Sequence, residues 1–353
     1  MADAMEREDE RRPVRRTLTD ELNLPDDEQL YSIDRLLPHG GNALFAGRYK
    51  AGKTTFNGQL LKAWADREPF LGEFDVYPDP EHPVVTIFNY EMSEGQFRRW
   101  LRRVGIRNTA HVHVVHLRGL SLPLSLPHIR EEVAEWLREA NTGLWIVDPA
   151  SRALAGVGDG NDNTDVARFV GWLDEIKLMA GVRDLVLNIH MGHAAAADKD
   201  AERAIGAQAW SAWADALWFL NKDKDNCRWF SADGRDVSVE KMLVSYQAED
   251  MSVALVDVDP ETQKRDMLDR KVIECITHNP GIGATRIRNE IGGNSTEVGH
   301  VLDRLIREGV IATRPGARRK VEHYLSEDAP ILTRGMGGDV QDSNSPSAED
   351  HTD

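Results

Sequence analysis

The amino-acid sequence predicts an α/β fold with a doubly wound, mainly parallel sheet, followed by a small winged helix-turn-helix domain. Short apolar runs that suit buried strands alternate with amphipathic helical segments through the first two thirds of the chain. The first of these strands leads directly into a glycine-rich loop and then a helix. After residue 264, three short helical segments precede two basic strands, which is the order of a winged helix.

Length and charge divide the chain into four expected parts. The 353 residues carry a formal net charge of −16, which excludes a polycation that coats nucleic acid. Residues 265–325 nevertheless carry 11 basic residues against 8 acidic ones, a net charge of +3. We expect a disordered segment over 1–28, a large domain over 29–260, the small domain over 265–326 and a disordered acidic tail over 327–353.

Cysteine usage and hydropathy indicate a cytoplasmic protein. Cys227 and Cys275 are far apart in sequence and form no C-x-x-C pair, so we expect no disulfide framework. The chain has no uninterrupted apolar run of about 18 residues, so we expect no membrane span. Residues 1–16 mix charges of both signs and lack an apolar stretch, which argues against a secretory signal.

The stretch Gly47-Arg48-Tyr49-Lys50-Ala51-Gly52-Lys53-Thr54-Thr55 matches the phosphate-binding pattern G-x-x-x-x-G-K-[ST]. An apolar strand over 42–46 precedes it, and a helix over 56–68 follows. Glycines allow successive backbone N–H groups to point at one phosphate, and the helix adds its positive N-terminal end. The pattern predicts a nucleoside triphosphate site with Mg²⁺, in which Lys53 contacts the β- and γ-phosphates and Thr54 binds the metal. The expected nucleotide-binding residues are Gly47, Lys50, Ala51, Gly52, Lys53, Thr54 and Thr55.

The remaining elements follow from periodicity and turn residues. Strands are expected over 83–89, 112–117, 143–149 and 184–189, with helices over 94–104, 128–140 and 164–180. Residues 202–220 are predicted to be helical, and segments at 228–230, 242–246 and 253–256 to form antiparallel hairpins at one sheet edge. After a charged linker over 261–265, helices are expected over 267–278, 283–291 and 295–308, and strands over 309–314 and 319–325.

Two carboxylates follow predicted strands and are candidates for hydrolysis. Asp148 ends a run of four apolar residues in the manner of a Walker B strand, so it is expected to bind Mg²⁺. Glu91 stands just beyond the strand over 83–89, where it can orient or activate an attacking water. The alternative for Glu91 is a surface glutamate that heads a helix, where its charge suits the helix dipole.

His190 ends the strand over 184–189 and therefore points toward the same sheet edge. We expect it to sense the γ-phosphate by hydrogen bonding. Polar capping is one alternative, and a metal pair with His193 is another. Lys53, Glu91, Asp148 and His190 are thus the candidate catalytic residues.

Oligomeric ATPases often use a positive side chain from a neighbouring subunit to neutralise transition-state charge. Arg203, Arg228 and Arg235 are the candidates, and each could instead be a solvated or ion-paired arginine.

In the C-terminal domain, the helix over 295–307 is expected to contact DNA bases, and the following strands to contact phosphates. A winged helix that binds protein instead is the alternative. The candidate DNA-binding residues are Asn294, Ser295, Thr296, His300, Arg314, Arg318, Arg319 and Lys320.

Residues from about 31 to about 250 resemble the RecA/KaiC-like AAA-family ATPases, a group that includes plasmid RepA-type hexameric replicative helicases. The motifs that carry the resemblance are the loop at 46–55, Phe88-Asn89-Tyr90-Glu91-Met92, Trp145-Ile146-Val147-Asp148-Pro149, Ile189-His190-Met191-Gly192-His193 and Gly234-Arg235-Asp236-Val237. The resemblance implies ATP and Mg²⁺ as ligands, Glu91 as the residue that activates water, Asp148 as the Walker B acid and His190 as the sensor. One departure is Ile205, which precedes Gly206 where such proteins tend to carry arginine.

The resulting expectation is a DNA-associated, ATP-hydrolysing motor that forms a homo-oligomeric ring or filament in plasmid or phage replication. One alternative is a recombination or loading ATPase that does not unwind DNA. Another is an ATP-dependent transcriptional switch that uses the winged helix. The acidic, glycine-rich loop over 156–163 weakens the helicase reading, because translocation would favour basic loops in a central channel.

Overall fold

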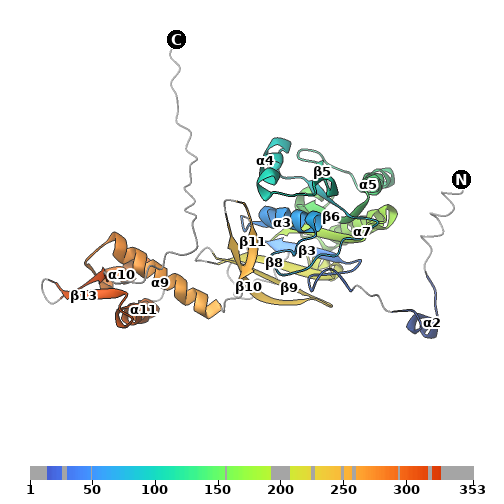
Figure 1. The fold of residues 1–353 in the computed structure, drawn as a ribbon. Helices are drawn as coiled ribbons and strands as arrows, with labels where there is room; N and C mark the ends of the chain where they lie inside the picture. The colour runs from blue at the N-terminus through green and yellow to red at the C-terminus, as the bar shows by residue number, and fades with distance from the viewer. Residues whose placement is uncertain are drawn as a thin grey trace, which may run out of the picture.

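The computed structural model describes residues 14–25, 30–48, 50–155, 157–191, 207–223, 227–247, 250–256, 260–292, 295–316 and 320–326. These residues form a large α/β unit and a small C-terminal unit (Figure 1). None of the helices in these ranges combines the length and the apolar character that crossing a membrane requires.

A large, mostly parallel sheet forms the centre of the α/β unit, as the sequence predicts. Its strand order within the described residues is β11-β10-β9-β8-β3-β7-β6-β4-β5. The strands from β8 to β5 in this order are parallel: β8 (Ala216–Lys222), β3 (Asn42–Gly47), β7 (Asp184–His190), β6 (Thr142–Asp148), β4 (Val84–Asn89) and β5 (Val112–His116). The antiparallel strands β9 (Arg228–Gly234), β10 (Ser238–Tyr246) and β11 (Val253–Val256) extend the other edge, which confirms the predicted hairpins.

Helices cover both faces of this sheet (Figure 1). Alternate residues of β3 explain the arrangement: Phe45 packs with the helix α3 (Lys53–Asp66), and Leu44 belongs to the cluster that contains α7 (Asn163–Ala180). The helix α4 (Glu94–Val104) lies on the α3 face, and α5 (Pro127–Glu139) lies on the α7 face. Because both faces are covered, the central strands β3, β4, β6 and β7 are mostly apolar. The shorter helical elements are α6 (Ala150–Ala153), η1 (Thr109–His111) and α8 (Gln208–Trp213).

An aromatic cluster joins β3, α3 and β8 below the glycine loop. The rings of Phe45 and Phe56 are 5.7 Å apart, and those of Phe45 and Trp218 are 6.0 Å apart. The indole of Trp218 donates a hydrogen bond of 2.9 Å to the Leu36 carbonyl. Large buried rings of this kind contribute strongly to packing, so the cluster fixes the two segments that flank the loop.

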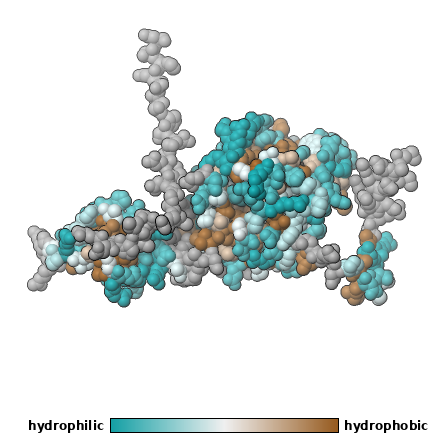
Figure 2. All heavy atoms as spheres, in the orientation of Figure 1, coloured by the Kyte–Doolittle hydropathy of each residue, from teal (hydrophilic) through white to brown (hydrophobic). Residues whose placement is uncertain are grey.

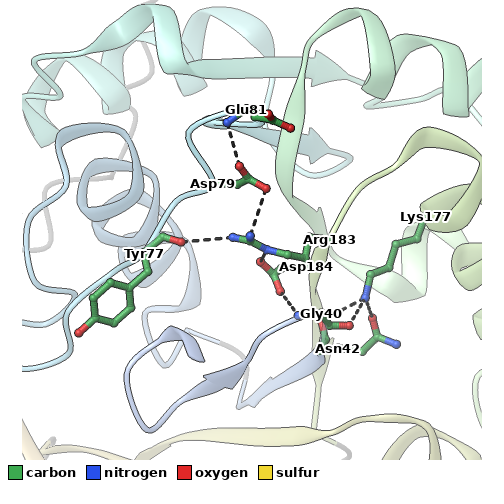
Figure 3. A network of polar contacts seen from close by, with 9 residues as sticks. Gly40, Asn42, Tyr77, Asp79, Glu81, Lys177, Arg183 and Asp184 are labelled. Atoms are coloured by element: carbon green, nitrogen blue, oxygen red, sulfur yellow. Dashed lines mark hydrogen bonds and ion pairs between the residues drawn. The ribbon is translucent and has the colours of Figure 1, made fainter. Parts of the chain in front are cut away.

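A polar network holds the opposite end of β3 (Figure 3). The Lys177 ammonium donates to the Gly40 carbonyl at 2.8 Å and to Asn42 Oδ1 at 2.7 Å. The Asp184 carboxylate accepts from the Gly40 N–H at 3.0 Å and from Arg183 Nε at 3.2 Å. Burial lowers the pKa of Lys177. These charge-assisted bonds anchor the start of β3, while its other end enters the glycine loop.

The prediction of a helix through residue 220 is wrong, because residues 216–222 form β8. Trp218 and Leu220 pack on the α3 face of the sheet, and Phe219 packs on the α7 face. This side-chain alternation belongs to a strand, but all of these residues are apolar and the sequence shows no period of two.

The N-terminal part of the chain contains one short helix, α2 (Leu18–Leu22), and a small two-stranded sheet of β1 (Tyr31–Ile33) and β2 (Leu37–Pro38). The helix lies inside the segment for which we expected disorder.

The C-terminal unit has three helices and a small antiparallel sheet in the order β12-β14-β13 within the described residues. Its own apolar core contains Val272, Ile287 and Leu302. The helix α9 begins at Pro260, so residues 261–265 are helical and do not form the linker that we expected. The elements are α9 (Pro260–His278), β12 (Ile282–Gly283), α10 (Ala284–Ile291), α11 (Ser295–Arg307), β13 (Ile311–Pro315) and β14 (Val321–Leu325).

Candidate nucleotide-binding site

The glycine loop connects the end of β3 to the first turn of α3. A Cβ atom at Gly47 would lie 3.1 Å from the Leu220 carbonyl oxygen and 3.2 Å from Lys53 Cγ, so only glycine fits there without a shift. Gly52 has a φ of 111° and forms the N-cap of α3 without a side-chain hydrogen bond. The first N–H groups of α3 are therefore not capped by a side chain, and such groups attract anions.

Lys53 lies at the start of α3 and is buried. Its Nζ donates to the Gly47 carbonyl at 2.7 Å and to His190 Nδ1 at 3.0 Å. Burial lowers the pKa of Lys53 to about 8, although the charges of Asp148 and Glu91 act in the opposite direction. A buried ammonium group gains more from a charged phosphate oxygen than from a neutral carbonyl oxygen. Bound phosphate is therefore expected to replace the carbonyl oxygens as hydrogen-bond acceptors of Lys53.

Asp148 ends β6 and is also buried. Its Oδ2 accepts a hydrogen bond of 2.9 Å from the Asn57 amide on α3. Burial raises the pKa of Asp148 and the charge of Glu91 raises it further, while Lys53 and the amides of Asn188 and Asn57 favour the carboxylate. The carboxylate thus lies between the loop helix and the neighbouring strand.

Glu91 is exposed and follows β4, where a tight turn leads into α4. Asn89 organises this turn: its Oδ1 accepts from the Glu91 N–H at 3.3 Å and from the Met92 N–H at 2.9 Å. The charge of Glu91 acts on Lys53, Asp148 and His190. The four predicted catalytic side chains therefore lie together at the carboxyl ends of β3, β4, β6 and β7.

His190 is the last residue of β7, which pairs with β3 at Gly47. Its Nδ1 accepts the hydrogen bond from Lys53 described above, so Nε2 carries the ring proton. Burial, followed by the positive charge of Lys53, lowers the pKa of His190, and Glu91 opposes this shift. The imidazole is consequently neutral at pH 7. His193, the proposed metal partner, lies outside the described residues.

A pocket of about 160 Å³ adjoins the loop on the side of the antiparallel strands. Arg228 forms one wall, and its Nε donates to the Ala51 carbonyl at 2.9 Å. The pocket is lined by Gly52, Thr55, Phe56, Arg228, Val244, Tyr246 and Val253. It combines apolar walls with two aromatic side chains and one cationic side chain, which is the composition of a small-molecule site.

Several polar groups around Asp148 fit a hydrated Mg²⁺ ion. Asn57 Oδ1 and Asn188 Oδ1 are buried and have no hydrogen-bond partner among the described residues. Such groups usually have a water or ion partner. Thr54 lies half-buried in the first turn of α3, and its hydroxyl and the Asp148 carboxylate are oxygen groups of the kind that Mg²⁺ prefers.

The sequence did not single out Asn57, Asn188 or Tyr246 as part of this site. Asn57 lies four residues after Lys53, one helical turn along α3, so its spacing could have placed it beside the loop. Asn188 is a polar residue inside an apolar strand and could have been noticed as unusual. Tyr246 carried no signal beyond its position in a strand.

The three arginines proposed to act in the site of a neighbouring subunit lie in different parts of the chain. Arg228 contacts the loop of its own chain, as described above. Arg235 follows β9 and lies 3.5 Å from Asp215, at the sheet edge opposite the glycine loop. Arg203 lies outside the described residues.

The predicted DNA-binding residues that the structure describes are exposed. Ser295, Thr296 and His300 lie on one face of α11, which also presents the acidic residues Glu297 and Asp303. Arg314 lies over the Tyr324 ring at 5.0 Å, and Lys320 precedes β14. The remaining candidates Asn294, Arg318 and Arg319 lie outside the described residues.

A family model described as the AAA domain matches residues 7–196, which is just over half of the chain. The chain belongs to the AAA domain family. The match includes the glycine loop, the strands β6 and β7 that end at Asp148 and His190, and β4 with the turn that contains Glu91. It identifies the protein as a nucleotide-binding NTPase, a class that normally requires Mg²⁺. No curated protein matches the sequence.

The lowered pKa of Lys53 leads to a prediction about pH. As the pH rises through about 8, Lys53 loses its proton, and ATP affinity is expected to fall because the positive charge is lost. In the absence of nucleotide, the free energy of unfolding is expected to rise with pH. The reason is that the unfolded chain binds more protons than the folded chain between about pH 8 and about pH 10.4. Titration of a fluorescent ATP analogue between pH 7 and pH 10 measures the affinity.

Lys53→Arg is the matched control, since a guanidinium keeps its charge over this range. The variant is expected to bind more weakly than the wild type but without the fall above pH 8. A wild-type affinity that is constant to pH 10 contradicts the prediction.

Proposed function

We propose that the protein is a RecA-like, Mg²⁺-dependent ATPase that works on DNA. The observation that carries this proposal is the convergence of Lys53, Glu91, Asp148 and His190 beside a glycine loop at one sheet edge. Nucleotide binding alone would require only the loop. A water-orienting carboxylate close to a Walker-type aspartate and lysine suits hydrolysis.

Each side chain has a proposed role. Thr54 and Asp148 hold Mg²⁺, which when bound neutralises charge on the phosphates. Lys53 moves its hydrogen bonds from the loop carbonyls to phosphate oxygens, and the backbone N–H groups of Gly52 and Lys53 hold the same anion. Glu91 orients the attacking water and accepts its proton. His190 donates from Nε2 and so reports whether a terminal phosphate is present.

The pocket beside Gly52 is the proposed place for the nucleoside. Tyr246 offers an aromatic surface and Arg228 a planar cation, both suited to stacking on a base. Val244 and Val253 provide the apolar floor.

The C-terminal unit is the proposed DNA-binding module. Its helices α9, α10 and α11 and its three-stranded sheet have the order of a winged helix-turn-helix, with Arg314 and Lys320 on the wing. We further propose that several copies assemble in a ring or filament, so that Arg235 or Arg203 of one copy reaches the site of the next.

One observation favours a loading or switching ATPase over a helicase. The loop after α6 uses its acidic residues in local structure: Asp162 caps α7, and Asp165 accepts from the Asp159 N–H at 2.9 Å. The part of this loop that the structure describes carries no basic residue between Leu154 and Asp162. It is therefore poorly suited to gripping a strand in a channel.

The test measures ATP turnover with no DNA, with single-stranded DNA and with duplex DNA, and strand displacement on a forked duplex. DNA-stimulated turnover with displacement supports a helicase, and stimulation without displacement supports the loading ATPase. Arg314→Gln/Lys320→Gln is expected to weaken duplex binding. The slope of log affinity against log salt concentration should become shallower by about 1 per substituted residue. If neither form of DNA changes the rate of ATP turnover and the protein binds no DNA, the DNA part of the proposal is overturned.

A further inference from the structure

Residues 95–130 form a positively charged island in an acidic chain. This stretch contains seven arginines and not one aspartate or glutamate, although the whole chain has 59 acidic residues against 43 basic ones. The arginines are Arg98, Arg99, Arg102, Arg103, Arg107, Arg118 and Arg130. An unbroken run of one charge sign in a chain of opposite net charge indicates a local interaction surface.

The helix α4 concentrates four of these arginines, Arg98, Arg99, Arg102 and Arg103, all of them exposed. We call them the arginine face. The opposite side of α4 packs on α3, where a Cβ at Gly58 would lie 3.0 Å from Val104 Cγ2. The close approach at Gly58 fixes the rotation of α4 and holds the arginine face outward. Figure 1 places α4 at the margin of the α/β unit, and Figure 2 shows a strongly hydrophilic surface there.

Three of the four arginines on this face have no counter-charge nearby in the part of the chain that the structure describes. Among the described residues, no carboxylate lies within ion-pair distance of Arg98, Arg99 or Arg102. Arg107 and Arg130 from the same island are paired, with Glu68 at 2.7 Å and Glu175 at 2.9 Å. Arg107 and Arg130 thus stabilise the fold, whereas Arg98, Arg99 and Arg102 remain available to a partner.

This arrangement is unfavourable for the isolated helix. Arg98 and Arg102 are four residues apart, as are Arg99 and Arg103, and like charges at this spacing repel each other. Only Arg102 and Arg103 lie in the last turn, where the helix dipole favours a positive charge. A polyanion that lies along the helix would relieve this repulsion.

We propose that the arginine face of α4 binds the phosphate backbone of a nucleic acid. Every cation on this face is an arginine, whose planar fork matches a phosphate with two parallel hydrogen bonds. Two rows of arginines at helical spacing suit a repeating anion better than a single acidic side chain. The proposal rests on the association with DNA proposed above, but it adds a site on the ATPase unit that is separate from the C-terminal unit.

The position of α4 makes such a contact relevant to hydrolysis. Ser93 caps α4 two residues after Glu91, and Asn89 ties the intervening turn to the end of β4. A nucleic acid on the arginine face therefore acts on an element that begins beside the proposed water-orienting carboxylate.

The test uses the full chain with Arg98→Gln/Arg102→Gln, and fluorescent single-stranded and duplex DNA of one sequence as probes. Affinity is measured from about 50 to about 200 mM salt. We expect weaker binding for all sequences. The salt slope, which is the slope of log affinity against log salt concentration, should become shallower by about 0.7 per lost contact on single strands and by about 0.9 on duplex. Arg98→Lys/Arg102→Lys is expected to keep most of the salt slope, because the charge remains.

Arg35→Gln/Arg168→Gln is the control with the same change in net charge, because both arginines are exposed and pair with carboxylates of their own region. It is expected to bind DNA like the wild type. The inference is overturned if both double variants lose the same amount of DNA affinity, or if the α4 variant loses none. Polyglutamate that displaces DNA as well as an unlabelled oligonucleotide also overturns it, because the face would then suit an acidic protein. A wild type that binds no DNA instead contradicts the proposed function itself.

Discussion

Lys53→Ala is expected to reduce ATP turnover by a factor of about 10² to 10³ or more. Lys53 is the only cation that we place against the transferred phosphate from within the same chain. Its Nζ already lies 2.7 Å from the Gly47 carbonyl at the base of the loop. Loss of a charge-assisted hydrogen bond also weakens binding, by about 1.5–3 kcal/mol. Phosphate release and titration with a fluorescent ATP analogue measure the two effects.

Lys53→Met is the matched control for this prediction. Methionine keeps the length and most of the volume of the buried side chain, so it separates loss of charge from loss of packing. Since burial lowers the pKa of Lys53, the ammonium group costs free energy in the folded protein, and its removal is not expected to lower the thermal midpoint without nucleotide. Retained turnover in either variant would mean that this loop is not the hydrolysis site.

The predictable part of the site depends on local patterns and on strand direction. The glycine loop could be identified because a strand, a turn and a helix are adjacent in sequence. Glu91, Asp148 and His190 are far apart in the chain, but each ends or closely follows an apolar run. Parallel strands bring such ends to one edge, and the structure confirms that these strands are parallel.

The parts that sequence did not predict depend on packing between distant segments. Asn57 and Asn188 belong to no motif, and they matter only because α3 and β7 lie on either side of Asp148. Residues 216–220 were assigned to the wrong element because a short strand buried on both faces has no polar alternation. The charge island over 95–130 was visible in sequence, but the ion pairs of Arg107 and Arg130 became apparent only in the structure.

Glu91→Gln is expected to bind ATP nearly as well as the wild type and to hydrolyse it about 10² to 10⁴ times more slowly. Glutamine keeps the shape of the side chain but cannot accept the proton of the attacking water. This outcome differs from that of Lys53→Ala, in which binding is also lost. Single-turnover hydrolysis and equilibrium binding, measured on the same preparation, distinguish the two.

Glu94→Gln is the control, because Glu94 lies in the first turn of α4 and interacts there with the helix dipole. If Glu91 merely headed the helix, the two variants would have similar and small effects on turnover.

The charge of Glu91 provides a second, independent measurement. It raises the pKa of Lys53 and also that of Asp148, so its removal lowers both. In Glu91→Gln the fall in ATP affinity at alkaline pH should therefore begin at a lower pH than in the wild type. Glu94→Gln should leave that pH unchanged, because Glu94 contributes to neither shift. A slow variant with an unshifted pH profile would mean that Glu91 lies farther from Lys53 during turnover than in this structure, and another group would then have to activate the water.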